Sequence, residues 1–410
     1  MKRNLLQQMR NEWRSNVWMT LELTIVSLIL WFLFSSLWSL FNVRLMHKGY
    51  DVDDLYATKI KIVDSQSSLY EPYDSLHSPF TDLELLISNL RENPNIEVIG
   101  VGRNIITYNY NYYGTELSYD TLTYPGNLRY LSPDVIRAYR LGAPDGTTTD
   151  QLAGIIERGD LIISKSDYDD NDAYNPEPFI GKDVILGRDS SCVRHIAAEA
   201  YGLRRADYEP QRGVIYAPLS TNDWPEQMII RIVNGRDKEF LESLTPADKR
   251  IGNVYLPEIK SLASYKEIAH LSINITIRSF LICATFLLVV IFLGFLGTFW
   301  FRTQERVDEI AIRMVNGASR RDIFRRFIGE GMLLLCISTI IAIPIELLMV
   351  HYGLLSDMMI SPTEITLKSA SIYQAMAITV LLMMLLIIAG IWLPARKAMN
   401  VDPAQALKDQ

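Results

Sequence analysis

Four stretches of the chain consist almost entirely of apolar residues and are long enough to cross a lipid bilayer. At a rise of ~1.5 Å per residue, about 20 helical residues span a hydrocarbon core of ~30 Å. The only charged residues in these stretches, Glu22 and Glu346, lie within a turn of an end, so we expect both at the membrane–water interface. The pattern therefore predicts four transmembrane helices, at residues 19–41, 279–301, 331–350 and 373–393.

Residues 42–272 contain no apolar stretch long enough to span a membrane, and short runs with strand-like and helix-like periodicity alternate along them. They predict a large mixed α/β domain inserted between the first and second transmembrane helices. A loop rich in Gly and Thr that ends near Asp150 predicts a boundary between two subdomains. The expected strands are 56–63, 96–101, 160–164, 183–187, 213–217 and 228–233. Four helices are expected: one begins at Thr81, one begins at Ser132, and the other two cover 193–205 and 238–244.

Helical patterns also flank the first two spans. From Glu258 an apolar helical pattern continues without Gly or Pro towards the second span, so we expect 273–301 to hold a stalk and this span in one stiff rod. Within it, Gly294 and Gly297 would either admit a closely packed helix or simply add flexibility. Residues 1–18 carry an apolar stripe among basic residues, which predicts a cytosolic amphipathic helix on the membrane surface or an extension of the first span.

The segment that follows the second span has the pattern of two helices joined by a tight turn. Apolar residues recur at helical spacing between Val307 and Met314, while Glu309 and Arg313 share a polar face. Asn316-Gly317 is a typical helix stop, because glycine adopts positive φ without strain. The Ser-x-x-Asp sequence directly after it has the spacing of a capping box for the next helix.

Charge is distributed unevenly along the chain. The net charge is −7, but residues 49–270 carry 22 Lys and Arg against 35 Asp and Glu, so the remainder is basic. An acidic domain lacks the positive surface that a phosphate backbone needs, which argues against nucleic acid as a partner. Positive residues gather at the N-terminus, in 302–330 and after Leu393, whereas 351–372 carries only Lys368. By the positive-inside rule, the termini and 302–330 are cytosolic and the mixed domain is outside.

No pattern typical of a catalytic or metal site is present in the sequence. The phosphate-binding GxxxxGK[ST] loop is missing, and no histidine has ligand spacing with a cysteine or a second histidine. Residues 167–171 mimic the start of a calcium loop, but Asp172 occupies its glycine position. Tyr108, Tyr110 and Tyr112 alternate as on one strand face, which suits sheet packing or ligand stacking. We therefore expect no catalytic, cofactor or metal site in this chain.

Two stretches resemble motifs of the MacB/FtsX-like permease family of ABC transporters. RTQERVDEIAIRMVNGASRRDIFRRFIGEGMLL, residues 302–334, is similar to the arginine-rich "REIGIRxxxGAxRxxI" stretch of that family. LPARKAMNVDPAQALK, residues 393–408, is similar to its closing "PAxxAxxxxPxxAL" tail. The order of parts also matches, and GDLIISKS, FIGKDVILG, HIAAEAYGLRR and VIYAPL follow more loosely the order of short motifs in the family's periplasmic domain.

This resemblance implies a mechanotransmission-type (type VII) permease subunit in the inner membrane of a bacterial cell. Its partners would be a cytosolic dimer of ABC ATPases, which binds ATP and Mg²⁺, and a second permease subunit, identical or paralogous. No cofactor is implied for this chain. The implied parts are a MacB-like periplasmic domain (42–272), a cytosolic coupling helix region (302–330), a short external loop (351–372) and a cytosolic tail (394–410). The implied ATPase-coupling residues are Glu305, Glu309, Arg313, Gly317, Ala318, Ser319 and Arg320.

Three functions follow from these expectations. The first is ATP-driven efflux of amphiphiles or peptides, or extraction of lipoproteins, with a periplasmic adaptor or a lipoprotein and membrane lipid among the partners. The second is FtsX-like regulation of a periplasmic cell-envelope enzyme. The third, from another class, is a membrane receptor with an external sensor domain, although 302–330 is too short to form a catalytic output module.

Overall fold

The computed structural model describes residues 13–73, 78–109, 113–166, 175–187, 192–305, 310, 312, 314–352 and 369–399. Two compact units make up the chain. A helical unit comprises residues up to 41 and most of the chain from 274 onward, and a mixed α/β unit comprises 42–273. Most of the expected N-terminal surface helix and the external loop lie outside the described residues, as do the end of the tail and the calcium-like loop.

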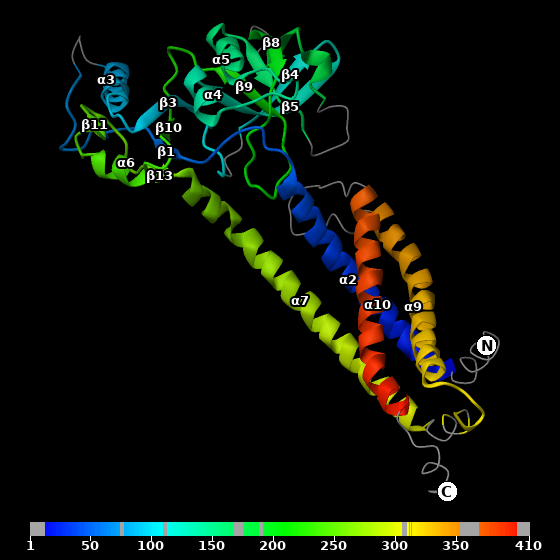
Figure 1. Ribbon diagram of the computed structural model, residues 1–410. Helices are drawn as coiled ribbons and strands as arrows, with labels where there is room; N and C mark the ends of the chain where they lie inside the picture. Colours follow the sequence, from blue (N-terminus) through cyan, green and yellow to red (C-terminus); the bar gives the residue numbers. More distant parts are fainter. Residues whose placement is uncertain are drawn as a thin grey trace. The chain divides into compact units, whose positions relative to one another are not determined.

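The helical unit contains four helices long and apolar enough to cross a membrane, as the sequence predicts. The second of them is unbroken over 44 residues, and at ~1.5 Å per residue it extends roughly 65 Å, about twice a hydrocarbon core. The expected rod is therefore confirmed, although it begins at Leu262 instead of Glu258 because Lys260 and Ser261 pair with a strand. The helices are α2 (Trp13–Leu45), α7 (Leu262–Glu305), α9 (Arg320–His351) and α10 (Ser369–Met399) (Figure 1).

The start of α9 differs from the sequence prediction. The pattern predicted a short helix after Ser319 and a separate span from Gly331. In the structure one helix begins at Arg320 and continues through Pro344 to His351. The predicted boundary at residue 330 therefore falls inside a helix, so the segment after the turn and the third span form one continuous element.

All four helices contribute to one apolar core. Phe295 and Phe299 of α7 stack with ring centroids 5.8 Å apart, and Phe327 of α9 meets Phe299 edge-on at 6.4 Å. The packing is close at Gly331 and Gly390, where a larger residue would have to displace its neighbours. A Cβ at Gly331 would lie 2.5 Å from Cδ1 of an isoleucine in α10, and one at Gly390 would lie 3.0 Å from Cβ of Phe295. Close approach of small residues is the typical way in which helices associate in lipid.

The glycines singled out from the sequence have different surroundings. A Cβ at Gly294 would lie 3.4 Å from Oε1 of Glu22, whereas no heavy atom of the described residues lies within 4 Å of that position at Gly297. Glu22 is exposed in α2. Glu346 is only 3% exposed within the helical unit.

The mixed unit is built on a ten-stranded sheet in the order β13-β1-β10-β3-β5-β4-β7-β8-β6-β9. Its first four strands form an open sheet, in which alternate residues face two different cores. Tyr56 and Met228 pack against α3 and α6, while Ala57 and Ile229 belong to the core covered by α4, and α5 lies beside α4 against strands of the second part of the sheet. These elements are β1 (Leu55–Lys59), β3 (Ile96–Arg103), β10 (Gln227–Ile232), β13 (Lys260–Ser261), α3 (Pro79–Arg91), α4 (Pro133–Tyr139), α5 (Thr149–Glu157) and α6 (Asp237–Ser243).

The other six strands close into a ring, because β5 pairs in parallel with β9 as well as with β4. Side chains such as Leu117, Tyr124 and Ile215 fill its interior. The ring consists of β4 (Gly114–Tyr119), β5 (Leu122–Leu131), β6 (Leu161–Ile163), β7 (Asp183–Leu186), β8 (Val193–Glu199) and β9 (Val214–Pro218). A separate small sheet contains β2 (Lys61–Ile62), β11 (Arg250–Ile251) and β12 (Val254–Tyr255), and a short 3₁₀ helix, η2, covers Glu177–Phe179.

Several elements of this unit differ from the sequence prediction. The helix expected at 193–205 is wrong: its first half is β8, held between β7 and β6, so strand pairing on both sides overrides local helix propensity. The loop expected to end near Asp150 is present at 141–148 and ends where α5 begins at Thr149, behind a capping box formed by Thr148 and Gln151, but it is not the boundary between the two parts of the sheet. The open sheet and the ring are joined instead by 104–113 and 219–226.

Two smaller corrections concern local geometry. The helix expected from Thr81 begins at Pro79, because the side chain of Ser78 accepts the hydrogen bond of the N-cap. Tyr108 does not lie on a strand: it occupies a bend with φ of 57°. The other two tyrosines of that pattern lie outside the described residues.

Arg204 joins the end of α2 to the mixed unit. Its guanidinium is buried and donates to the carbonyl oxygens of Val43 and His47, both at 3.1 Å. Because hydrogen bonds from a buried charged group are strong and their loss leaves two acceptors unsatisfied, Arg204→Met should lower the free energy of unfolding of the mixed unit by about 3 kcal/mol. Urea titration of the full chain in micelles measures this change.

The matched control is Arg158→Met, whose side chain is 64% exposed beside Asp160 at 3.7 Å. A surface pair of this kind contributes little to stability. Equal effects of the two substitutions would contradict the role assigned to Arg204.

Candidate functional site

The predicted coupling residues lie around the turn between α7 and α9. Glu305 is the exposed last residue of α7, and Arg320 is the exposed first residue of α9. Gly317 adopts φ of 93°, which confirms the predicted helix stop. Ser319 caps α9: its hydroxyl accepts from the Asp322 N–H, and the Asp322 carboxylate accepts from the Ser319 N–H at 3.1 Å. Ala318, between Gly317 and Ser319, is half-buried, while Glu309 and Arg313 lie outside the described residues.

This turn has a buried inner face and an exposed outer face. Ile310 belongs to the same apolar core as the four long helices, and so do Ile323 and Phe327 of α9. On the outer face, Ile312 and Val315 are 51% and 65% exposed. With the exposed arginines at the start of α9, they form a surface that is apolar and cationic, which suits a protein partner with acidic and apolar residues. Because the inner face is part of the core, displacement of the turn must displace the helices.

A second site, which sequence reasoning missed, surrounds Asp207 in the loop between β8 and β9. Lys48 Nζ lies 2.7 Å from Oδ1 of Asp207, and Lys266 Nζ lies 2.8 Å from Oδ2. The hydroxyl of Tyr108 donates to Oδ1 at 2.8 Å. The Asp207 backbone N–H donates to Nε2 of His270 at 3.0 Å. We call these five residues the Asp207 cluster.

The members of the Asp207 cluster come from four segments of the mixed unit. Lys48 follows the end of α2, whereas Lys266 and His270 lie in the first turns of α7. Tyr208, the neighbour of Asp207, extends the contacts: its ring meets His270 at 5.1 Å between centroids, and its hydroxyl accepts from Nη1 of Arg44 at 3.0 Å. One loop of the mixed unit therefore holds the end of α2 and the start of α7.

The charges of the Asp207 cluster are well matched. Burial alone would raise the pKa of Asp207, but hydrogen bonds from Lys266, Lys48 and Tyr108 outweigh it and hold the pKa well below its usual range. Burial raises the pKa of Tyr108, so its hydroxyl keeps the proton that it donates. Burial lowers the pKa of His270, and the neighbouring lysines act in the same direction, against the attraction of Asp207. A neutral imidazole is the form that can accept the Asp207 N–H.

A pH dependence follows from His270. Its folded pKa lies below the unfolded value of 6.5, so its stabilising contribution is complete above that pH and is lost as pH falls through the folded pKa. Between pH 7 and pH 5 the unfolding temperature of the mixed unit should fall, and His270→Gln, which keeps an acceptor, should reduce this fall. Thermal unfolding at a series of pH values measures both.

His195, at the surface beside Asp183, provides the control. In His195→Gln the pH dependence should remain that of the wild-type chain. If His270→Gln behaves in the same way as this control, the imidazole of His270 does not contribute to the pH dependence.

Among the residues that the structure describes, no group of three His, Cys, Asp or Glu side chains is placed to hold a metal ion. The described residues of both sites are held by apolar contacts, hydrogen bonds and ion pairs.

Comparison with known proteins places the C-terminal region in a family. Residues 265–403 match the family model described as FtsX-like permease C-terminal. The chain is also 32% identical over 121 residues to the pyoverdine export ATP-binding/permease protein PvdT of Pseudomonas entomophila (strain L48), and 30% identical over 118 residues to its namesake in Pseudomonas fluorescens (strain Pf0-1). Each match covers 29% of this chain and 17% of the relative, so the chain spans about a sixth of the length of these curated relatives.

Among solved structures, the extracellular domain of the noncanonic ABC-type transporter YknZ from Gram-positive bacteria is similar to part of this chain. The match covers 49% of this chain and 100% of that domain, with 12% sequence identity and a TM-score of 0.31.

Proposed function

We propose, on the premise that residues 265–403 match the FtsX-like permease C-terminal family, that the chain is the permease subunit of an ABC transporter and that it turns ATP hydrolysis in a separate subunit into movement of its mixed α/β unit. The single observation that carries the proposal is α7, one unbroken helix from the first turns held by the Asp207 cluster to the turn at Glu305. A stiff helix with a packed site at each end transmits displacement, because packed cores shift as units.

The proposed ATPase docks on the turn between α7 and α9. Its surface combines exposed Ile312 and Val315 with the exposed Arg320, and its inner face is packed into the helical core. Glu309 and Arg313 are included from the family resemblance. A second permease subunit, identical or paralogous, completes the proposed assembly.

The proposed orientation places the termini and this turn in the cytosol and the mixed unit outside the inner membrane. It is supported by the concentration of Lys and Arg in 302–330 and near the termini. In this orientation the mixed unit does the work, by exporting an amphiphile or peptide or by extracting a lipoprotein. The pyoverdine export proteins similar to this chain make efflux the first function to test.

The docking proposal is tested by co-purifying the chain with candidate ATPases, with stimulation of ATP hydrolysis as the second readout. Gly317→Pro should abolish both, because proline fixes φ near −65° and the turn needs a positive φ. Gly317→Asn, which tolerates this conformation, should retain most of the stimulation. Glu309→Lys should reduce binding at least tenfold while Glu309→Gln reduces it less. Normal binding by Gly317→Pro and Glu309→Lys would refute docking at this turn.

Transmission through α7 is tested separately at Ser272, an exposed position in the helix. Ser272→Pro should leave ATPase binding intact but uncouple hydrolysis from substrate movement, because proline breaks an interior helix at a cost of about 3 kcal/mol. Ser272→Ala is the matched control and should behave as wild type. Transport by Ser272→Pro at the wild-type rate would show that α7 does not carry the movement.

A further inference from the structure

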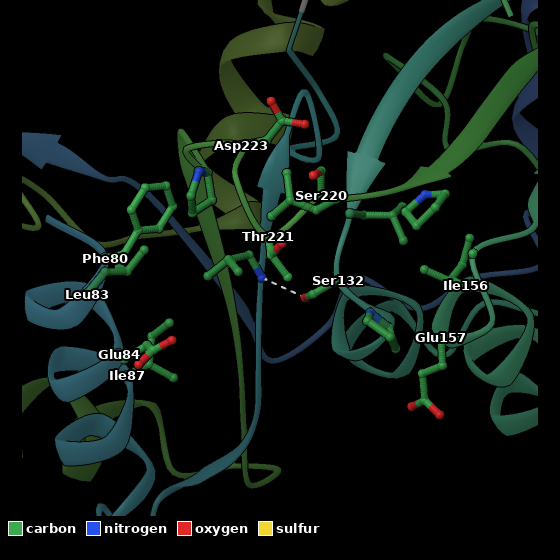
Figure 2. A pocket seen from close by; sticks show the side chains of 17 residues that line it. Phe80, Leu83, Glu84, Ile87, Ser132, Ile156, Glu157, Ser220, Thr221 and Asp223 are labelled. Carbon is green, nitrogen blue, oxygen red and sulfur yellow. Dashed lines mark hydrogen bonds between the residues drawn. The ribbon is translucent and has the colours of Figure 1, made fainter. Parts of the chain in front are cut away.

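A cavity of about 480 Å³ lies in the mixed unit, at the place where the open sheet meets the closed ring. Figure 2 shows Leu83 and Ile87 of α3 on one side and Ile156 and Glu157 of α5 on the other. Pro218, the last residue of β9, also lines it, and so do residues 219, 220, 221, 223 and 225 of the segment that joins β9 to β10. The volume falls within the range of about 300–1,000 Å³ that is typical of small-molecule sites.

The lining of this cavity combines apolar side chains with negative charge. Three carboxylates, those of Glu84, Glu157 and Asp223, line it, whereas none of its 17 lining residues is Lys, Arg or His. The apolar part includes Leu83, Ile87, Val101, Leu131, Ile156 and Pro218.

Nearby arginines neutralise these carboxylates only in part. Arg137 contacts Glu157 at 2.9 Å and also contacts Asp134 and Asp150, while Arg91 lies 2.9 Å from Asp134, so three carboxylates share two cations. Arg103 lies 3.7 Å from Asp223 and 3.9 Å from Glu226. Glu84 is exposed and forms no ion pair in the part of the chain that the structure describes. The cavity therefore carries a surplus of negative charge.

We propose that this cavity binds a cationic amphiphile, a molecule of drug-like size with an apolar body and a positively charged amine. The apolar walls would cover its body, and Glu84, aided by Asp223, would hold its charge. An anionic molecule of the same size would meet repulsion without a compensating cation. This proposal rests on the proposed function in one respect, since it names the substrate class that the mixed unit handles.

The cavity lies between two parts of the mixed unit, so its ligand would contact both parts. One wall belongs to α3, which packs on the open sheet, and the other to α5 and the segment after β9. Residues 219–226 are also one of the two connections between the open sheet and the ring. A ligand bound in the cavity would therefore contact both the open-sheet part and the ring part of the mixed unit. Movement of one part relative to the other would change the fit and hence the affinity.

Binding to the full-length chain in phosphatidylcholine nanodiscs, without any ATPase, tests the proposal. The probes are rhodamine 6G, a cationic xanthene dye, and fluorescein, an anionic dye with the same ring system, followed by fluorescence anisotropy with empty nanodiscs subtracted. Rhodamine 6G should bind saturably and fluorescein should not. Glu84→Lys should weaken rhodamine binding at least tenfold, and Thr221→Trp should do so by filling the cavity.

The controls are Glu242→Lys, which reverses an exposed charge on α6 away from the cavity, and Asn222→Trp, next to Thr221 but outside the lining. Both should bind rhodamine 6G as the wild type does. Equal binding of the two dyes, or unchanged binding by Glu84→Lys and Thr221→Trp, would overturn the proposal. Since no ATPase takes part, failure of ATPase docking leaves this result unaffected, and the two proposals fail separately.

Discussion

The structure depends on a carboxylate that is withdrawn from water and held between two ammonium groups. Removing a charge from water costs several kcal/mol, so a buried Asp207 is tolerated only because Lys48, Lys266 and Tyr108 together replace its hydration. An apolar cluster of equal volume would hold these segments together at least as firmly. The charged groups add geometric specificity. The Asp207 carboxylate can bond to all three donors only when α2, α7 and the loop after β8 are in one arrangement.

The continuity of α7 adds to the importance of the Asp207 cluster, which holds the first turns of this helix. A single α-helix has no internal hinge unless Pro, Gly or an inserted group interrupts its hydrogen bonds, and α7 contains only Gly294 and Gly297, both far along it from His270. At its other end, Ile310 ties the turn to the apolar core of the helical unit. α7 is thus one continuous helix from Leu262 to Glu305.

Local sequence patterns predicted the four long helices and the cap of α9. The features that they did not predict depend on contacts between residues far apart in the sequence. The four long helices were predictable because an uninterrupted apolar segment in lipid must satisfy its own backbone hydrogen bonds, and an α-helix does so within the segment. The helix stop at Gly317 and the cap at Ser319 were predictable as well, because each is decided within four residues. The ring depends on β5 meeting β9, and β8 is a strand only because neighbours flank it on both sides. The Asp207 cluster likewise joins residues far apart in sequence, and no local signal marks them as partners.

The closed ring reduces the number of strand edges that could pair with other protein chains. Exposed strand edges invite pairing with other chains, and a domain that changes shape with each cycle would reveal such edges repeatedly. Six of the ten strands avoid this hazard because β9 returns to β5 and leaves no free margin. At the far margin of the open sheet, β13 offers only two residues before the chain turns into α7. Most of the ten-stranded sheet therefore offers no free margin for pairing with another chain.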